Sequence, residues 1–182
     1  MQEAAIISDL TTSHLREVSE QDLEMLLCWR NHSSVSQYMY HQNTITMDEH
    51  LRWYARTQKN PLTANYIFEH RDKPSGFVSL SRYSWANIGE WGFYIAPEAD
   101  KGTGRALAEV TLKHFFENLQ MDKINAEVID YNTRSINYHK RLGFVEEGFR
   151  KNYYVKNNVF YDILFFGLKQ SDYLETQKNA SA

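Results

Sequence analysis

A predicted strand that runs through a proline into a helix by way of two glycines constrains this chain more than any other segment. The segment is Ile95-Ala-Pro-Glu-Ala-Asp-Lys-Gly-Thr-Gly-Arg-Ala106. Gly102 and Gly104 allow another group to approach the backbone closely, and the first amides of a helix have no partner within it. Those amides and the helix dipole attract an anion. The segment therefore predicts a phosphate site at a strand-to-helix junction.

Two common nucleotide-binding loops are excluded by the residues that follow the second glycine. The GxGxxG fingerprint requires a third glycine where this chain has Leu107, and a Walker A loop requires Lys-Ser/Thr where it has Arg105-Ala106. A plain glycine-containing helix start stays open as an alternative. Lys101 and Arg105 are the cations that would assist a phosphate.

The hydrophobic pattern predicts strands and helices of a single mixed α/β (α+β) domain over residues 1–182, with flexible ends at about 1–12 and 173–182. Capping boxes at Ser19–Asp22 and Thr46–Glu49 begin helices, and Asn157-Asn158 is a strong hairpin turn. Lys73-Pro74 and Ala86-Asn87 supply further turns. Strands are expected at His14–Val18, Ala64–His70, Gly76–Tyr83, Ile88–Ile95, Ile124–Ile129, Phe149–Val155 and Val159–Leu168. Helices are expected from Ser19 to about Asn31, from Thr46 to before Pro61, from within Lys101–Arg105 to about Asn118, and over Ser135–Leu142.

Composition and charge exclude several classes of protein. The net charge of −3, without a run of five like charges, argues against a nucleic-acid-binding face. The single cysteine, Cys28, excludes an internal disulfide and a multi-cysteine zinc site. Met1–Leu10 lacks the features of a signal peptide, and the longest apolar run, Ile163–Phe166, is too short to cross a bilayer. We expect a cytoplasmic protein without metal, nucleic-acid partner or membrane association.

A second motif, Asn132-Thr-Arg-Ser-Ile-Asn-Tyr-His-Lys-Arg-Leu-Gly-Phe144, follows the glycine loop by about thirty residues. With Leu15–Leu23, Cys28–Asn31 and the Tyr153–Leu168 hairpin, its order along the chain resembles the GNAT superfamily of N-acetyltransferases. The resemblance covers about Leu15–Leu168. It implies the GNAT acyl-CoA N-acyltransferase fold, a central mixed β-sheet splayed in the middle and flanked by helices, with acetyl-CoA as co-substrate.

The resemblance implies that backbone amides of the glycine loop bind the coenzyme A pyrophosphate and that Asn132 binds the pantetheine arm. The implied cofactor-binding residues are Tyr94, Ile95, Lys101, Gly102, Thr103, Gly104, Arg105, Ala106 and Asn132. Two positions depart from the family pattern, since Ala99 replaces the usual Gln or Arg and Asp100 replaces a frequent glycine. Because most loop contacts are made by backbone amides, we expect binding with one polar anchor missing.

Attack of an amine on a thioester requires a deprotonated nucleophile, a stabilised oxyanion and a proton for the leaving thiolate. A backbone N–H around Tyr94–Ile95 would serve the oxyanion. His139 stands where many relatives have the tyrosine that protonates the thiolate, with Tyr138 as the second candidate. Glu90 or Ser79, either one through water, is expected as the base. Packing in the core, a solvated face or an ion pair is the structural alternative for each.

The acceptor site of this superfamily involves the first two helices and the strands beside them. Trp29–His32, Tyr38–Tyr40 and Thr46–His50 resemble a subgroup that acetylates a UDP-linked amino-deoxysugar in pseudaminic acid biosynthesis, a pathway of flagellin glycosylation. Cations would bind the diphosphate, while rings and apolar side chains would bind the uracil and the sugar methyl. The candidates are Trp29, Arg30, Tyr38, Met39, His50, Ser81, Arg82 and Tyr94.

Three other functions stay open at this point. A Rim-type N-terminal acetyltransferase of ribosomal proteins shares several motifs and would bind a peptide. A polyamine acetyltransferase would need an acidic pocket, for which Asp48-Glu49 is the only local basis. A non-catalytic acyl-CoA-binding module is the alternative outside enzymes. The aromatic C-terminal hairpin would also allow a homodimer.

Overall fold

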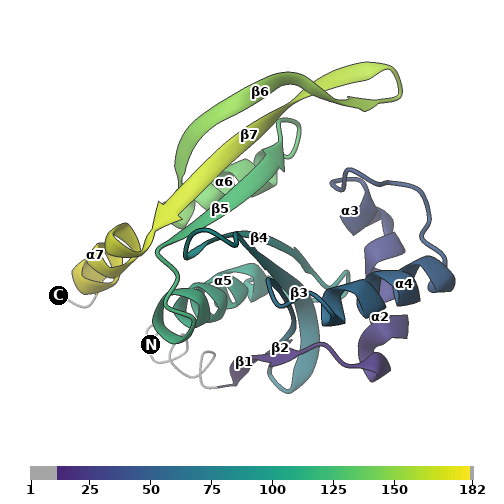
Figure 1. Cartoon of the computed structure of the whole chain (residues 1–182), viewed down its shortest axis with the longest axis horizontal. Coiled ribbons are helices and arrows are strands. Elements are labelled where there is room, and N and C mark those ends of the chain that lie inside the picture. The colour runs from purple at the N-terminus through teal and green to yellow at the C-terminus, as the bar shows by residue number, and fades with distance from the viewer. Residues whose placement is uncertain (1–11, 181–182) are drawn as a thin grey trace. The chain divides into compact units, whose positions relative to one another are not determined.

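The computed structural model describes residues 12–180, which alternate strands and helices as the pattern predicts (Figure 1). The elements are β1 (Ser13–Glu17), the 3₁₀ turn η1 (Glu20–Asp22), α2 (Leu23–Asn31), α3 (Ser33–Ser36), α4 (Met47–Gln58), β2 (Thr63–His70), β3 (Lys73–Arg82), β4 (Ile88–Ile95), α5 (Thr103–Lys113), the π-helical turn η2 (His114–Asn118), β5 (Lys123–Ile129), α6 (Thr133–Arg141), β6 (Val145–Lys156), β7 (Val159–Lys169) and α7 (Gln170–Ala180). None of the described helices is long and apolar enough to span a membrane.

The strands form a mixed sheet in the order β1-β2-β3-β4-β5-β7-β6. The β4–β5 pair is parallel, whereas β1–β2, β2–β3, β5–β7 and β6–β7 are antiparallel. The parallel register runs from Ile88 to Glu90, in the first part of β4, as a sheet splayed in its middle implies. This arrangement confirms the predicted mixed α/β class. The chain divides into two compact units, the chain to Ser81 with Gly92–Phe115, and Arg82–Trp91 with the chain from Phe116.

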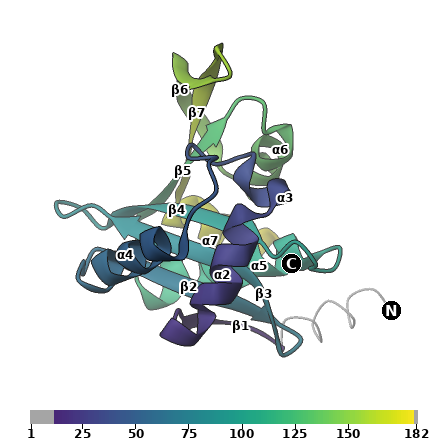
Figure 2. The same cartoon turned by 90° about the vertical axis from the view of Figure 1, so that its right-hand side faces the viewer.

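In the first unit, neighbouring residues of β2 contact helices on opposite faces of the sheet. Ile67 packs with Leu26 and Trp29 of α2, on the face that α2 and α4 cover in Figure 2. Tyr66 instead contacts the rings of His114 and Phe115 in η2, which directly follows α5. Because side chains alternate along a strand, β2 is apolar toward both faces and is buried over its middle.

The turn between β2 and β3 differs from the expectation. Lys73-Pro74 was the expected turn, but β3 begins at Lys73, and the chain reverses at Arg71-Asp72 with φ of 53° and 59°. Two consecutive residues at positive φ match the right-handed twist of the paired strands, which favours this two-residue turn. Pro74 is tolerated in β3 because it faces Glu69, next to a register irregularity in β2.

In the second unit, α6 packs on the face of the sheet that carries Phe166. His139 of α6 stacks on Phe166 at a ring-centroid distance of 5.6 Å. The described part of the segment from residue 173, which the sequence predicts to be flexible, is helical. Residues 170–180 form α7, and its Tyr173 stacks on Phe116 at 4.9 Å. Residues 1–11 and 181–182, at the ends that were expected to be flexible, lie outside the described residues.

The hairpin of β6 and β7 turns at Asn157-Asn158, with φ of 51° and 61°, as predicted. Lys156 pairs with Val159 directly across this turn. The strand β6 begins at Val145, four residues earlier than expected, and contains two register irregularities. The hairpin is the longest pair of strands in the described chain, and β6 lies at an edge of the sheet.

Candidate active site

The glycine loop of the first unit enters α5 as the sequence predicts. Gly102 is the N-cap of α5 and has a φ of 97°, a backbone conformation that residues with a side chain rarely adopt. A Cβ atom at Gly102 would meet nothing within 4 Å, so glycine is needed there for its conformation and not for space. Thr103, at 2% exposure, donates from Oγ1 to the carbonyl oxygen of Asp100 at 2.8 Å. The loop therefore presents a helix N-terminus in the form that suits a pyrophosphate.

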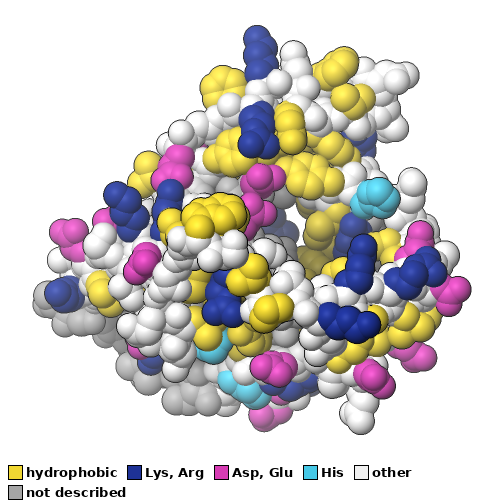
Figure 3. Space-filling model, in the orientation of Figure 1, with side chains coloured by type: hydrophobic (Ala, Val, Ile, Leu, Met, Phe, Trp, Pro, Cys, Tyr) yellow, Lys and Arg dark blue, Asp and Glu magenta, His cyan; other side chains and the backbone are white. Residues whose placement is uncertain are grey.

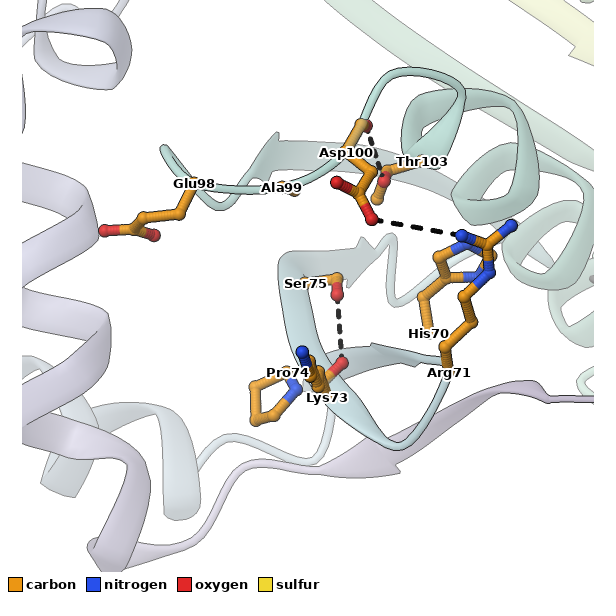
Figure 4. A pocket seen from close by; sticks show the side chains of 9 residues that line it. All are labelled: His70, Arg71, Lys73, Pro74, Ser75, Glu98, Ala99, Asp100 and Thr103. Atoms are coloured by element: carbon orange, nitrogen blue, oxygen red, sulfur yellow. Dashed lines mark hydrogen bonds and ion pairs between the residues drawn. The ribbon is translucent and has the colours of Figure 1, made fainter.

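The two departures from the family's loop pattern have structural explanations. Ala99 packs against the hydrophobic core cluster that includes Leu26 and Trp29 of α2, which explains an apolar residue at this position. Asp100 lies 3.9 Å from Nη1 of Arg71 in the β2–β3 turn, as Figure 4 shows. Of the two candidate cations, Arg105 pairs with Glu109 at 2.7 Å, and Lys101 is exposed.

A cavity of about 360 Å³ lies between this loop and the β2–β3 turn (Figure 4). Arg71 comes from the turn and Lys73 from the start of β3, while Glu98 and Asp100 come from the loop. The cavity thus carries cations on one wall and carboxylates on the other. It belongs to the first unit and adjoins the backbone that would bind the pyrophosphate.

Three of the predicted acceptor residues come together in the first unit. Arg30 donates from Nη2 to the carbonyl oxygen of His41 at 2.6 Å, but its Nη1 is buried and lacks a hydrogen-bond partner. Burial lowers the pKa of Arg30 and raises that of Tyr94, and the charges of the two groups act on each other. His50 is 5% exposed, and its Nε2 also lacks a partner. Burial and the charge of Arg30 lower the pKa of His50, so its imidazole is neutral at pH 7.

Aromatic rings line the same part of the first unit. His50 stacks on Trp53 at 5.0 Å, Trp53 meets the edge of Phe77 at 6.0 Å, and Phe77 stacks on Tyr94 at 5.1 Å. Trp53 and Phe77 were not among the sequence candidates. The spacing of His50 and Trp53 along α4 was the available signal, because residues three apart are neighbours on a helix.

The other acceptor candidates lie elsewhere. Trp29 is 5% exposed and packs in the core, which leaves little of its ring for a uracil. Tyr38 and Met39 are half-buried in the turn after α3. Ser81 and Arg82 are exposed at the end of β3, and Arg82 belongs to the second unit. Ser79, the alternative base, donates from Oγ to the carbonyl oxygen of Gly92 at 3.3 Å.

The second unit contains the other candidate base. Glu90 on β4 pairs in register with Asn125 on β5, and Glu127 follows two residues later. Burial and then the charge of Glu127 raise the pKa of Glu90. Nearby Lys123 is held by Glu147, whose two carboxylate oxygens both lie 2.7 Å from its Nζ. Sequence reasoning missed Glu127 and Asn125, because their approach to Glu90 depends on the register between two strands far apart in the chain.

The candidate acid His139 is fully enclosed in the second unit. It is 2% exposed, and burial lowers its pKa to about 4. Its Nε2 accepts a hydrogen bond from Nε1 of Trp91 at 3.2 Å, and its Nδ1 lies 2.8 Å from the carbonyl oxygen of Ser135. Both ring nitrogens of a neutral imidazole are therefore used. This geometry favours the packing role that the sequence left open, while Tyr138 beside it is half-buried.

Asn132 begins α6, where its Oδ1 accepts a hydrogen bond from the amide of Ser135 at 3.1 Å. The side-chain oxygen is thus used as the helix cap, and the Nδ2 group is the donor that a pantetheine carbonyl would meet. Whether Asn132 binds the cofactor stays a prediction.

The fold and these residues identify a class of protein. Residues 14–145 match the family of the acetyltransferase (GNAT) domain, and the chain therefore belongs to the GNAT acetyltransferases. This confirms the predicted fold and an acetyl-CoA-dependent N-acetyltransferase.

Three proteins that are similar to this chain carry different names. The chain is 26% identical over 156 residues to acetyltransferase PseH of Campylobacter jejuni strain 81-176, covering 86% of this chain and 91% of that protein. It is 31% identical over 88 residues to the prophage-derived uncharacterized N-acetyltransferase YokL of Bacillus subtilis, covering 47% and 50% of the two chains. Spermidine N-acetyltransferase from Vibrio cholerae, solved with CoA and spermine, superposes with a TM-score of 0.83 at 24% identity, covering 90% of this chain and 99% of that one. This last likeness shows the fold alone.

Proposed function

We propose that this enzyme transfers the acetyl group of acetyl-CoA to the 4-amino group of a UDP-linked amino-deoxysugar in pseudaminic acid biosynthesis. The observation that carries the proposal is the buried Nη1 of Arg30, which has no hydrogen-bond partner. A buried guanidinium is costly unless an anion or acceptor compensates it. The diphosphate of a nucleotide sugar supplies such an anion. The resemblance of Trp29–His32, Tyr38–Tyr40 and Thr46–His50 to the pseudaminic acid subgroup favours the same acceptor class.

The rings beside Arg30 suit the remainder of such an acceptor. Trp53 and Tyr94 are half-buried rings whose exposed parts a uracil or a deoxysugar methyl would meet with apolar surface. Phe77 is buried in the core and supports them, because it contacts both rings. Neutral His50 has one unused ring nitrogen, Nε2, for a hydrogen bond to the acceptor. Arg30 and His50 therefore bind the diphosphate, and the rings bind its apolar neighbours.

A polyamine acceptor fits this cluster poorly. A polycation would be repelled by Arg30, and the acidic pair expected for it is already used in part. Glu49 accepts hydrogen bonds from both the amide and Oγ1 of Thr46 at 2.8 Å, and these bonds lower its pKa. Its carboxylate thus caps α4. The Rim-type alternative, which requires a peptide acceptor, has no comparable observation in its favour.

Acetyl-CoA supplies the thioester that the amine attacks, and the residues of the chain move the protons. Glu90, with its pKa raised, removes a proton from the acceptor amine, either directly or through water. Ser79, the alternative base, would act by holding that water. A backbone N–H around Tyr94–Ile95 donates to the developing oxyanion. Tyr138 protonates the leaving thiolate, because neutral His139 has both ring nitrogens in hydrogen bonds.

We further propose a cytoplasmic homodimer formed through the β6–β7 hairpin. Of the ten large apolar side chains exposed among the described residues, six lie on these two strands. They are Val145, Phe149, Tyr153, Val155, Val159 and Phe160. Figure 3 shows apolar side chains gathered over the hairpin. Such a concentration on an edge hairpin is typical of a protein interface.

The function is tested by thiol release from acetyl-CoA with purified protein and three acceptor classes. We expect release with UDP-4-amino-4,6-dideoxy-N-acetyl-β-L-altrosamine and none above background with spermine or an Ala- or Ser-starting peptide. Release with spermine or the peptide alone would overturn the acceptor assignment. Binding of acetyl-CoA without release for any acceptor would instead favour the non-catalytic module.

A further inference from the structure

Asn125 occupies the point in the second unit where strands β4 and β5 bring polar side chains together. It is the register partner of Glu90 across the parallel β4–β5 pair. Glu127 lies two residues further along β5 and so shares the sheet face of Asn125. The three side chains thus form one polar group on the face opposite Ala126 and Val128, which are buried.

The side-chain oxygen of Asn125 has no hydrogen-bond donor. Its Oδ1 is buried, and no described group donates to it. More than nine in ten buried polar groups of native proteins are paired, so an exception at a strand centre requires an explanation. A donor that arrives with a ligand would complete the hydrogen bonding of this amide.

The charges around Asn125 indicate the kind of donor. Glu90 and Glu127 stand on the same face, and their mutual repulsion contributes to the raised pKa of Glu90. The nearest cation on β5, Lys123, is bound by Glu147. A negative field with an unfilled acceptor favours a positively charged N–H donor, which is an ammonium group.

We infer that Oδ1 of Asn125 accepts a hydrogen bond from the acceptor's amino group and holds that nitrogen beside Glu90. Asn125 is then an acceptor-binding residue, and a carboxylate beside it receives the proton that the ammonium loses. The inference rests on the proposed amine acetylation, but it does not depend on which amine is the natural acceptor.

The test uses the full-length Asn125→Leu variant, which removes the oxygen at similar side-chain volume. One hydrogen bond to a charged group corresponds to a change of about tenfold to a hundredfold. We expect the KM of the UDP-amino-sugar to rise by that factor, with a smaller change in kcat. The Kd of coenzyme A, measured by calorimetry, should stay within twofold. The melting temperature should not fall, because an unfilled buried acceptor has been removed.

Asn125→Asp is the conservative variant, because it keeps an acceptor oxygen at the same place. Its KM for the sugar should lie within about threefold of the wild type. Asn118→Leu, an exposed amide at the end of η2, is the surface control and should change neither constant.

An unchanged KM in Asn125→Leu would overturn the inference, as would an equal rise in the Kd of coenzyme A. If Asn125→Leu does not fold, Asn125→Ala, which also removes the side-chain oxygen, provides the same comparison. Failure of the proposed function is distinguishable, because the wild type would then release no thiol with the sugar. The Asn125 variants are in that case compared with whichever amine the wild type acetylates.

Discussion

Nε1 of Trp91 donates to Nε2 of His139 at 3.2 Å, and this bond joins β4 to α6 inside the second unit. The acceptor nitrogen must be unprotonated for the bond to form. The burial of His139 maintains the same neutral state, because burial disfavours the charged form. This geometry therefore favours a packing role for His139, in which it holds α6 against the sheet.

The first prediction concerns stability against pH. The folded pKa of His139 is about 4, against an ordinary value of 6.5, so the unfolded chain binds more protons between these values. Stability is therefore fully present above pH 6.5 and falls as the pH decreases toward 4, by about 3 kcal/mol from this residue. Melting temperatures of wild type and His139→Leu from pH 7.5 to 4.5 measure this contribution.

In His139→Leu, the fall of melting temperature toward pH 4.5 should be markedly smaller than in the wild type. His32→Gln, at an exposed histidine, should keep the wild-type pH dependence. Identical slopes for wild type and His139→Leu would show that His139 is accessible to protons in the folded chain.

Local signals predicted much of the fold. The capping boxes at Ser19 and Thr46 are satisfied within four residues, and both form as expected. The Asn157-Asn158 turn is equally local. The turn at Arg71-Asp72 was missed because Lys73-Pro74 has stronger turn chemistry, and α7 was missed because Tyr173 packs on the distant Phe116. Elements that depend on distant contacts are not readable from a local pattern.

The candidate site likewise contains features that depend on local sequence and features that depend on distant contacts. The glycine loop is local, and Gly102 adopts the backbone conformation that its residue type suggested. The burial of Trp29 and the hydrogen bond between Trp91 and His139 depend on tertiary contacts. So is the proximity of Glu127 to Glu90, which follows from strand register. Residue types thus predicted the glycine loop and its backbone conformation, whereas the surroundings of the candidate acid and base depend on the packed structure.

The second prediction concerns the cofactor loop. In Gly102→Ala, the added methyl group meets open space, but a φ of 97° is strained for alanine by about 1 kcal/mol. The loop should relax away from the conformation that presents its amides. We expect the Kd of coenzyme A, measured by calorimetry, to rise several-fold.

Gly143→Ala is the matched control, since Gly143 has a φ of 88° and lies after α6. It should lose similar stability and leave the Kd of coenzyme A near the wild-type value. If both variants changed the Kd equally, coenzyme A binding would not depend on the backbone conformation at Gly102 in particular.

The third prediction concerns the base. Burial and the charge of Glu127 raise the pKa of Glu90, and only the deprotonated carboxylate accepts a proton. The acidic limb of kcat/KM should therefore lie above the ordinary pKa of glutamate. Glu127→Gln removes the repulsion and should move that limb to lower pH. Glu90→Gln should reduce kcat by about a hundredfold or more.

The control for these variants is Glu146→Gln, at an exposed glutamate of β6 that pairs with Lys140 of α6. It should leave the acidic limb in place. Full activity of Glu90→Gln together with loss in Ser79→Ala would assign the base to the water held by Ser79.

The fourth prediction concerns assembly. Phe149 and Phe160 are 58% and 60% exposed on the β6–β7 hairpin. If a second copy covers them, Phe160→Asp places an unpaired charge in that interface and should produce a monomer in light scattering. Leu51→Asp, at a residue of α4 that is 45% exposed, should stay dimeric. A wild-type protein that is monomeric at all concentrations would contradict the dimer.

The fifth prediction concerns the acceptor cation. Arg30→Met keeps the length of the side chain and removes the buried charge whose Nη1 has no partner. Stability should be unchanged or higher, because methionine avoids the free-energy cost of burying a charge, the cost that lowers the pKa of Arg30. The KM of the UDP-amino-sugar should rise about tenfold to a hundredfold, as expected when a charged group loses a hydrogen bond to phosphate.

Arg52→Met, at an exposed arginine of α4, is the control and should retain the wild-type KM. A polyamine acceptor predicts the opposite sign, since removal of a repelling cation would lower the KM of spermine. Kinetics of both acceptors with the two variants therefore separate an anionic acceptor from a cationic one by direction as well as by size.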